Sequence, residues 1–157
     1  MADEKFDLKK EYEILKSKYK LPDFNILNNE FEISSIDKKD FLLKLIRRKM
    51  NDKLIMFCRI IENIVFPSSQ NPFTNYESTF FDENKRKQLL KLHKKLMIYE
   101  RQSLLLDITP DDMDDADYIK DLTKEWSDFK KETHETVKEM QKSWHTEAKD
   151  EEEDYFG

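Results

Sequence analysis

Apolar residues recur along most of this chain at intervals of three and four, which is the spacing of one face of an α-helix. The clearest example covers residues 83–106, where the intervals run 3, 4, 3, 4 and 3 and form a seam like that of a coiled coil. Asp82 stands directly before this segment and is a suitable N-cap. The seam consists of Leu89, Leu92, Leu96, Tyr99, Ser103 and Leu106.

Four other segments carry the same spacing, and we predict helices over residues 3–19, 23–31, 36–66 and 110–148. Each presents one apolar side, which a folded protein has to cover. In chain order, these sides consist of Leu8, Tyr12, Leu15 and Tyr19; Phe24, Leu27 and Phe31; Leu43, Ile46, Met50, Phe57, Ile61 and Ile64; and Ile119, Leu122, Trp126, Phe129, Thr133, Val137, Met140 and Trp144.

Prolines and capping residues mark the expected helix boundaries. Pro22 and Pro67 end the first and third helices, because the residue before a proline is pushed out of the α region. Residues 34–37 include two serines and an aspartate, which suit the N-cap of the third helix. We expect Thr109 to cap the last helix, with Pro110 at its first position and several aspartates opposing the helix dipole.

Composition narrows the fold class further. The chain has one glycine in 157 residues, and it is the last residue. The chain can therefore hold few tight hairpins, which need positive φ angles, and no glycine-rich phosphate-binding loop. We predict an all-α protein, an elongated antiparallel bundle of three to four long helices plus one short helix. This bundle forms a single domain over residues 1–149, followed by an acidic tail over residues 150–157.

Residues 67–82 form the one long segment without a helical pattern, and this segment is rich in aromatic side chains. A loop of this length in a small domain is usually functional or disordered, and disordered segments are poor in aromatic residues. Two interpretations follow: the rings cover one end of the bundle, or they form a surface that binds a partner. The candidate partner-binding residues are Phe73, Tyr76, Phe80 and Phe81.

Basic residues gather in the first halves of the two central helices, although the net charge of the chain is −6. These residues either form solvated helix sides that pair with acids of other helices, or they share one face that contacts phosphates. Lysine outnumbers arginine in these helices, which suits general solvation better than bidentate phosphate recognition. The candidate basic face consists of Arg47, Arg48, Lys49, Lys87, Lys91, Lys94 and Lys95.

Residue types that bind metals or carry out catalysis form no recognisable constellation. None of the three histidines has a glutamate three positions before it, so the Glu-x-x-His motif of di-iron bundles is absent. Cys58 lies in an apolar run, where a thiol ordinarily packs as a small hydrophobic group. The acids between Asp107 and Asp117 either hold Mg²⁺ for a hydrolytic reaction or cap a helix. We expect no cofactor, no bound metal and no catalytic residues.

The chain ends in five consecutive acids over residues 150–154, followed by Tyr155 and Phe156. This tail either docks its aromatic residues on a partner or is a frayed, solubilising end. No apolar run approaches the ~20 residues that cross a bilayer, and we see no secretory signal. We therefore expect a cytoplasmic protein that does not bind membranes.

The sequence predicts a non-catalytic helical-bundle module that binds a protein partner or associates with itself. Two alternatives stay open. One is a nucleic-acid or ribonucleoprotein-associated factor that uses the basic face of the two central helices. The other is a metal-dependent all-α hydrolase that uses the acids between Asp107 and Asp117.

Overall fold

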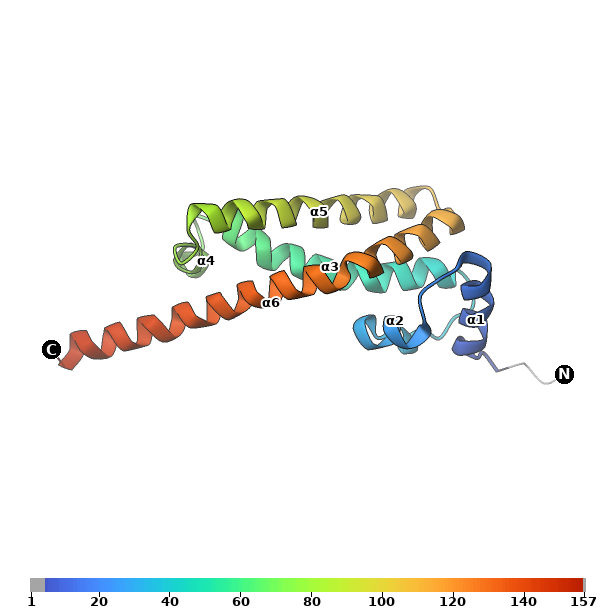
Figure 1. Ribbon diagram of the computed structural model, residues 1–157, viewed down its shortest axis with the longest axis horizontal. Helices are drawn as coiled ribbons and strands as arrows, with labels where there is room; N and C mark the ends of the chain where they lie inside the picture. Colours follow the sequence, from blue (N-terminus) through green and yellow to red (C-terminus); the bar gives the residue numbers. More distant parts are fainter. Residues whose placement is uncertain (1–4, 157) are drawn as a thin grey trace. The chain divides into compact units, whose positions relative to one another are not determined.

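A computed structural model describes the backbone of residues 5–156 and the side chains of residues 5–146. Over this range the chain is all-α, as predicted, with six α-helices and one short 3-10 turn (Figure 1). The elements are α1 (Leu8–Tyr19), α2 (Phe24–Phe31), η1 (Ile33–Ser35), α3 (Leu42–Val65), α4 (Pro72–Ser78), α5 (Glu83–Ile108) and α6 (Asp112–Phe156). Among the described residues, no helix combines the length and the apolar character that spanning a membrane requires.

The chain folds into two compact units, and three helices contribute residues to both. Over the described residues, unit 1 consists of residues 5–55 and 98–126, and unit 2 consists of residues 56–97 and 127–156. The first part of α3, the last part of α5 and the first part of α6 therefore belong to unit 1, together with α1 and α2. The remaining parts of these three helices belong to unit 2, together with α4.

The core of unit 1 is built where the sequence predicts apolar helix sides. Tyr12 of α1 is fully buried, and its ring centroid lies 5.5 Å from that of Phe24 in α2. Phe31 at the end of α2 packs on Trp126 of α6, with 4.7 Å between ring centroids. The hydroxyl of Tyr12 donates to the carbonyl of Pro22, so its polar atom is satisfied, and burial raises the pKa of this phenol. The α3 residues of this core are Leu42, Leu43, Ile46, Met50 and Leu54.

Unit 2 has a core of the same kind, with a more polar contribution from α6. Val137, predicted to lie in the α6 seam, is exposed, whereas Thr136 and Ser143 are buried. The hydroxyls of these two residues donate to carbonyls of their own helix, to Glu132 at 2.8 Å and Met140 at 2.6 Å, which allows their burial. The apolar residues of this core include Phe57, Cys58, Ile61, Ile64, Leu89, Leu92, Leu96 and Phe129.

The helices α1 and α3 begin later than predicted. The helix α1 starts at Leu8 rather than residue 3, because Asp7 caps it and accepts a hydrogen bond from the Lys10 amide at 3.4 Å. The helix α3 starts at Leu42 rather than residue 36, so the N-cap predicted over residues 34–37 is wrong. Phe41, directly before α3, has a φ of 60°, and this left-handed backbone cannot be part of a helix.

The boundaries of α6 also differ from the prediction. Thr109 is not its N-cap, because the Thr109 amide still donates to the Leu105 carbonyl at 2.8 Å and so belongs to the end of α5. Asp111 caps α6 instead and accepts from the Asp114 amide at 2.9 Å. The helix continues to Phe156, past the predicted end at residue 148, and no proline or glycine interrupts it. The side chains of the acidic tail and the whole of Gly157 lie outside the described residues.

The segment 67–82 is not one continuous loop, because Pro72–Ser78 form the helix α4. The carboxamide oxygen of Asn71 accepts from the amides of Phe73 at 3.0 Å and Thr74 at 3.4 Å. Pro72 occupies the first helical turn, where its missing N–H costs no hydrogen bond. Asn71 and Pro72 together are a helix-start signal in the sequence. The helix has only seven residues, which are too few to show a clear apolar periodicity.

Candidate protein-interaction site

The helix α4 and the turn after it present aromatic side chains of unit 2 at the surface. Phe73 and Tyr76 are three residues apart and therefore lie on one side of α4, and Phe80 follows in the turn that leads to α5. Trp144, on α6, joins them from a distant part of the sequence. We call these four residues the aromatic surface.

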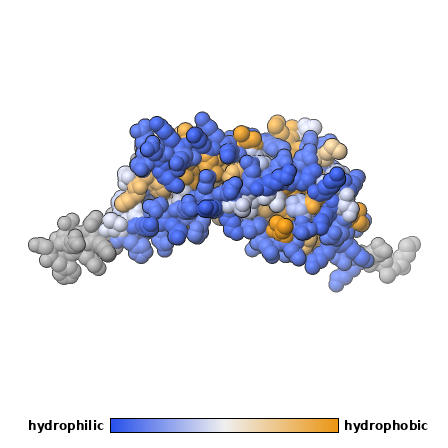
Figure 2. Space-filling model, in the orientation of Figure 1, coloured by the Kyte–Doolittle hydropathy of each residue, from blue (hydrophilic) through white to orange (hydrophobic). Residues whose placement is uncertain are grey.

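The four rings of the aromatic surface form a continuous row. The centroid of Trp144 lies 6.1 Å from that of Phe73 and 4.8 Å from that of Tyr76. Tyr76 in turn meets Phe80 edge to face at 5.1 Å. Although they are in contact, Phe73, Phe80 and Trp144 keep 65%, 41% and 38% of their surface exposed. Figure 2 shows hydrophobic residues at the surface near α4.

Two hydrogen bonds fix these rings in place. The Tyr76 hydroxyl donates to the backbone carbonyl of Ser143 at 3.0 Å. The indole N–H of Trp144 donates to a carboxylate oxygen of Glu77 at 3.1 Å, which ties α6 back to α4. The polar ends of both side chains are thus engaged within unit 2. The exposed part of the surface is therefore largely apolar and is already held in one arrangement.

A groove of about 410 Å³ adjoins the aromatic surface at Phe80. One wall comes from the turn before α5 and the first turn of that helix, and the other from the α6 residues 135–142. Three lysines and three acids line it, so the groove carries no net charge, and Lys142 pairs with Glu139 at 3.2 Å. The lining residues are Phe80, Phe81, Asp82, Lys85, Glu135, Lys138, Glu139 and Lys142.

The structure sorts the predicted aromatic residues into two groups. Phe81 is only 4% exposed and belongs to the core of unit 2, although an edge of it lines the groove. Phe73 and Phe80 are exposed, and Tyr76 connects them to Trp144. The sequence pattern missed Trp144 as a surface residue, because its spacing fits the seam. Residues 127–146 contain no leucine or isoleucine, and this composition indicates that this part of α6 lacks an ordinary apolar seam.

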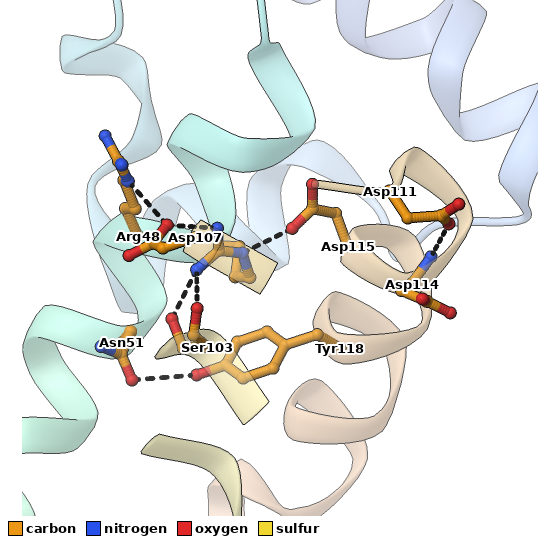
Figure 3. Close-up of polar contacts among 9 residues, drawn as sticks. Arg48, Asn51, Ser103, Asp107, Asp111, Asp114, Asp115 and Tyr118 are labelled. Carbon is orange, nitrogen blue, oxygen red and sulfur yellow. Dashed lines mark hydrogen bonds and ion pairs between the residues drawn. The ribbon is translucent and has the colours of Figure 1, made fainter. Parts of the chain in front are cut away.

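Arg47, the first residue of the predicted basic face, is not at the surface. Its side chain is fully buried in unit 1 and binds groups of α5 and α6. Figure 3 labels its partners Ser103, Asp107 and Asp115. The guanidinium donates to Asp115 at 2.5 Å, to Asp107 at 2.6 Å and to the Ser103 carbonyl at 2.9 Å. Tyr118 donates to the Asn51 side chain close by, at 3.3 Å. Arg47 therefore holds α3, α5 and α6 together and does not contact solvent.

The pKa values of the two acids bound by Arg47 are shifted in opposite directions. Burial raises the pKa of Asp115, and the bond to Arg47 offsets only part of this effect. Partial burial also acts on Asp107, but its bonds to Arg47 and Arg48 prevail and hold its pKa below the ordinary value. Arg47 thus occupies the space between Asp107 and Asp115 that a cation would need. Within the described part of the chain, no group of three histidine, cysteine or acidic side chains is placed to hold a metal ion.

The rest of the predicted basic face is divided between the two units. In unit 1, Arg48 is half exposed and pairs with Asp107 at 3.1 Å, and Lys49 is half-buried. In unit 2, four exposed lysines lie within nine residues of α5, and one of them pairs with Glu83 at 3.6 Å. These are Lys87, Lys91, Lys94 and Lys95.

No protein-family model, curated protein or solved structure matches this chain. Function is therefore inferred from the chemistry of the two units themselves. The aromatic surface of unit 2 is the feature in which exposure, ring contacts and a neighbouring groove coincide.

Proposed function

We propose that this chain is a non-catalytic protein-interaction module and that unit 2 binds a partner through the aromatic surface. The observation that carries the proposal is the row of four touching rings, three of which remain more than one-third exposed. An unpartnered helical protein ordinarily turns such rings inward, where each buries a large apolar area. Binding a partner would remove this area from water instead.

The anchoring of the rings favours tight binding. Tyr76 and Trp144 are each held by a hydrogen bond, so little conformational freedom remains to be lost when a partner covers them. Tryptophan and tyrosine also dominate the residues whose removal costs most in measured interfaces. A partner would place an apolar side chain beside Phe80, and the lysines and acids of the groove would form the polar rim.

The experiment that tests the proposal is capture of partners from native lysate by the tagged chain, in parallel with two variants. The first variant combines Phe73→Ala and Phe80→Ala, which removes two exposed rings and leaves both anchoring hydrogen bonds in place. The matched control is Phe41→Ala, because Phe41 is 74% exposed but lies in unit 1. Each partner identified is then purified, and its affinity for the three proteins is measured.

The proposal predicts at least one protein partner that resists nuclease treatment and binds the wild type and Phe41→Ala equally. Its affinity for the double variant should fall at least about tenfold, since central aromatic residues carry most of the binding energy. Equal binding of every partner by the wild type and the double variant would contradict the proposal. Partners lost by both variants alike would contradict it as well, because the loss would not depend on unit 2.

A second candidate function is nucleic-acid binding by α5 in unit 2. The observation that favours it is the group of four exposed lysines, which helical spacing places on one side of the helix. Binding of the wild type to single-stranded or duplex nucleic acid should weaken steeply as salt rises, and exchange of Lys87, Lys91, Lys94 and Lys95 for glutamine should abolish it. If the wild type shows no binding at low salt, this function is wrong.

Other parts of the sequence-based hypothesis stay predictions. A cytoplasmic location and the absence of catalysis rest on the sequence patterns alone. A coiled-coil pairing of two copies is an alternative to a different partner, and the mass of the chain in solution tests it. Hydrolysis with a metal ion has no observation in its favour, because Asp107 and Asp115 are bound by Arg47.

A further inference from the structure

The groove beside Phe80 combines an apolar lining with lysines on both of its walls. Phe81 is 4% exposed and lines the groove, and Phe80, 41% exposed, connects the groove to the aromatic surface. Lys85, in the first turn of α5, belongs to one wall, and Lys138 of α6 belongs to the other. The volume of about 410 Å³ lies in the usual range of ~300–1,000 Å³ for ligand pockets. The groove can therefore hold a short segment of a partner chain.

Three of the six charged side chains of the groove already have partners within unit 2. Lys142 pairs with Glu139 at 3.2 Å, so these two charges offset each other. Asp82 accepts a hydrogen bond from the Lys85 amide at 2.7 Å. It lies at the amino end of α5, where the helix dipole stabilises a negative charge. These three groups are therefore engaged before any partner arrives.

The other three charged side chains of the groove have no partner among the described residues. The ammonium groups of Lys85 and Lys138 and the carboxylate of Glu135 take part in no ion pair or side-chain hydrogen bond there. Lysine only donates hydrogen bonds, and a carboxylate only accepts them. A carboxylate that enters the groove thus has an available ammonium group on each wall, whereas a cation has one available carboxylate.

We propose that the partner of the aromatic surface carries an acidic residue next to an apolar residue and that this segment occupies the groove. The apolar residue packs on Phe80, and the carboxylate binds Lys85 and Lys138. Contact with the rings supplies most of the affinity, and the two lysines select acidic segments over neutral or basic ones. This inference rests on the proposed function, because it names the class of partner that the aromatic surface binds.

The test selects binders from a library of random displayed peptides with the immobilised full chain. The same selection is carried out with Lys85→Gln combined with Lys138→Gln, which removes both available ammonium groups. The matched control combines Lys94→Gln with Lys131→Gln, which removes one exposed lysine from α5 and one from α6, both outside the groove. None of these four lysines forms an ion pair within the described residues, so the exchanges leave the fold intact.

The proposal predicts that the wild type and the control enrich peptides with aspartate or glutamate within two positions of an apolar residue. The variant of Lys85 and Lys138 should lose this preference, and it should bind an acidic peptide at least about fivefold more weakly than the wild type does. Exchange of the acid of this peptide for its amide should weaken binding to the wild type by a similar factor. The same exchange should change nothing further in the variant, because the carboxylate and the lysines then no longer interact.

A selection that yields no acidic peptides, or acidic peptides that both lysine variants bind equally, would overturn the proposal. Enrichment of lysine or arginine would overturn it as well, because Glu135 would then determine the choice of partner. The variant Phe73→Ala with Phe80→Ala separates this proposal from the proposed function. Neutral peptides that lose affinity for this variant would contradict the acidic partner alone. Acidic peptides that bind this variant as tightly as the wild type would contradict the proposed function.

Discussion

Arg47 connects three helices of unit 1 through a single side chain. It is fully buried, and its partner Asp115 has only 2% of its side chain exposed. The opposite charges, together with the hydrogen bonds to Ser103, make the burial of this guanidinium tolerable. Sequence reasoning placed Arg47 on the surface because arginine is ordinarily exposed. The sequence position of Arg47 nevertheless indicates burial, because Arg47 stands between Ile46 and Met50, which belong to the apolar side of α3 and are buried.

Arg47→Met should destabilise the chain by about 3–5 kcal/mol, because it leaves the buried carboxylate of Asp115 without a partner. The double variant Arg47→Met with Asp115→Leu should recover most of this loss, since neither charge then remains in the core. Urea denaturation of the wild type, both single variants and the double variant measures the coupling. Additive losses in the double variant would show that the two residues do not stabilise each other.

The lowered pKa of Asp107 predicts a specific dependence of stability on pH. Its ordinary value is 3.8, and the pKa is lower in the folded chain because Arg47 and Arg48 bind the carboxylate. Asp107 therefore contributes stability above pH 3.8, and this contribution is lost as the pH falls through the lowered value. Asp107→Asn should destabilise the chain near neutral pH, and the difference from the wild type should shrink below pH 3.8. Unfolding by urea at several pH values measures this difference.

The control for this experiment is Asp112→Asn, which alters an exposed carboxylate outside the ion pairs of unit 1. Its effect on the free energy of unfolding should be small at every pH. A destabilisation by Asp107→Asn that stays constant down to the lowest pH would contradict the role assigned to the two arginines.

At the scale of the helix, α4 places the rings of the aromatic surface. Seven residues are too few for a stable helix on their own, so capping and contacts with α6 have to hold α4 in place. Asn71 provides the N-terminal hydrogen bonds, and the bond from Tyr76 to Ser143 attaches the helix to α6. The arrangement of the rings therefore depends on Asn71, which is not itself part of the aromatic surface.

Asn71→Ala should destabilise α4 by about 1 kcal/mol, the usual cost of losing an N-cap side chain. Amide hydrogen exchange over residues 73–78 should become faster, while exchange in unit 1 stays unchanged. Asn63→Ala is the matched control, because Asn63 is exposed on α3 and caps no helix. Equal exchange in both variants would mean that Asn71 does not hold α4.

Helix spacing predicted five of the six helices of the described chain, because burial of one side imposes a strong pattern. Boundaries were predicted less well where the backbone departs from the helix without proline or glycine, as at Phe41 with its φ of 60°. The candidate site was predicted in part. Phe73, Tyr76 and Phe80 follow from composition, whereas Trp144 joins them through a tertiary contact that no local pattern specifies.

For the whole molecule, the aromatic surface and the lysines of α5 are exposed surfaces of different chemistry. The aromatic surface adjoins a groove with equal numbers of lysines and acids, whereas four exposed lysines lie on one side of α5. A partner of the aromatic surface should therefore depend on apolar contact, and a nucleic acid bound by the lysines should bind more weakly as salt rises. Exchange of the four lysines should leave the affinity of the aromatic surface unchanged, and binding measured with both sets of variants checks this independence.

The most direct test of the central claim is photo-crosslinking from the position of Phe73 in living cells. A photoreactive phenylalanine analogue at this position keeps an aromatic ring on the surface, and the same analogue at the position of Phe41 is a control of similar exposure. The account predicts a discrete protein adduct from position 73 that resists nuclease and is absent from position 41. The same adducts from both positions, or none from position 73, would contradict a partner-binding role for the aromatic surface.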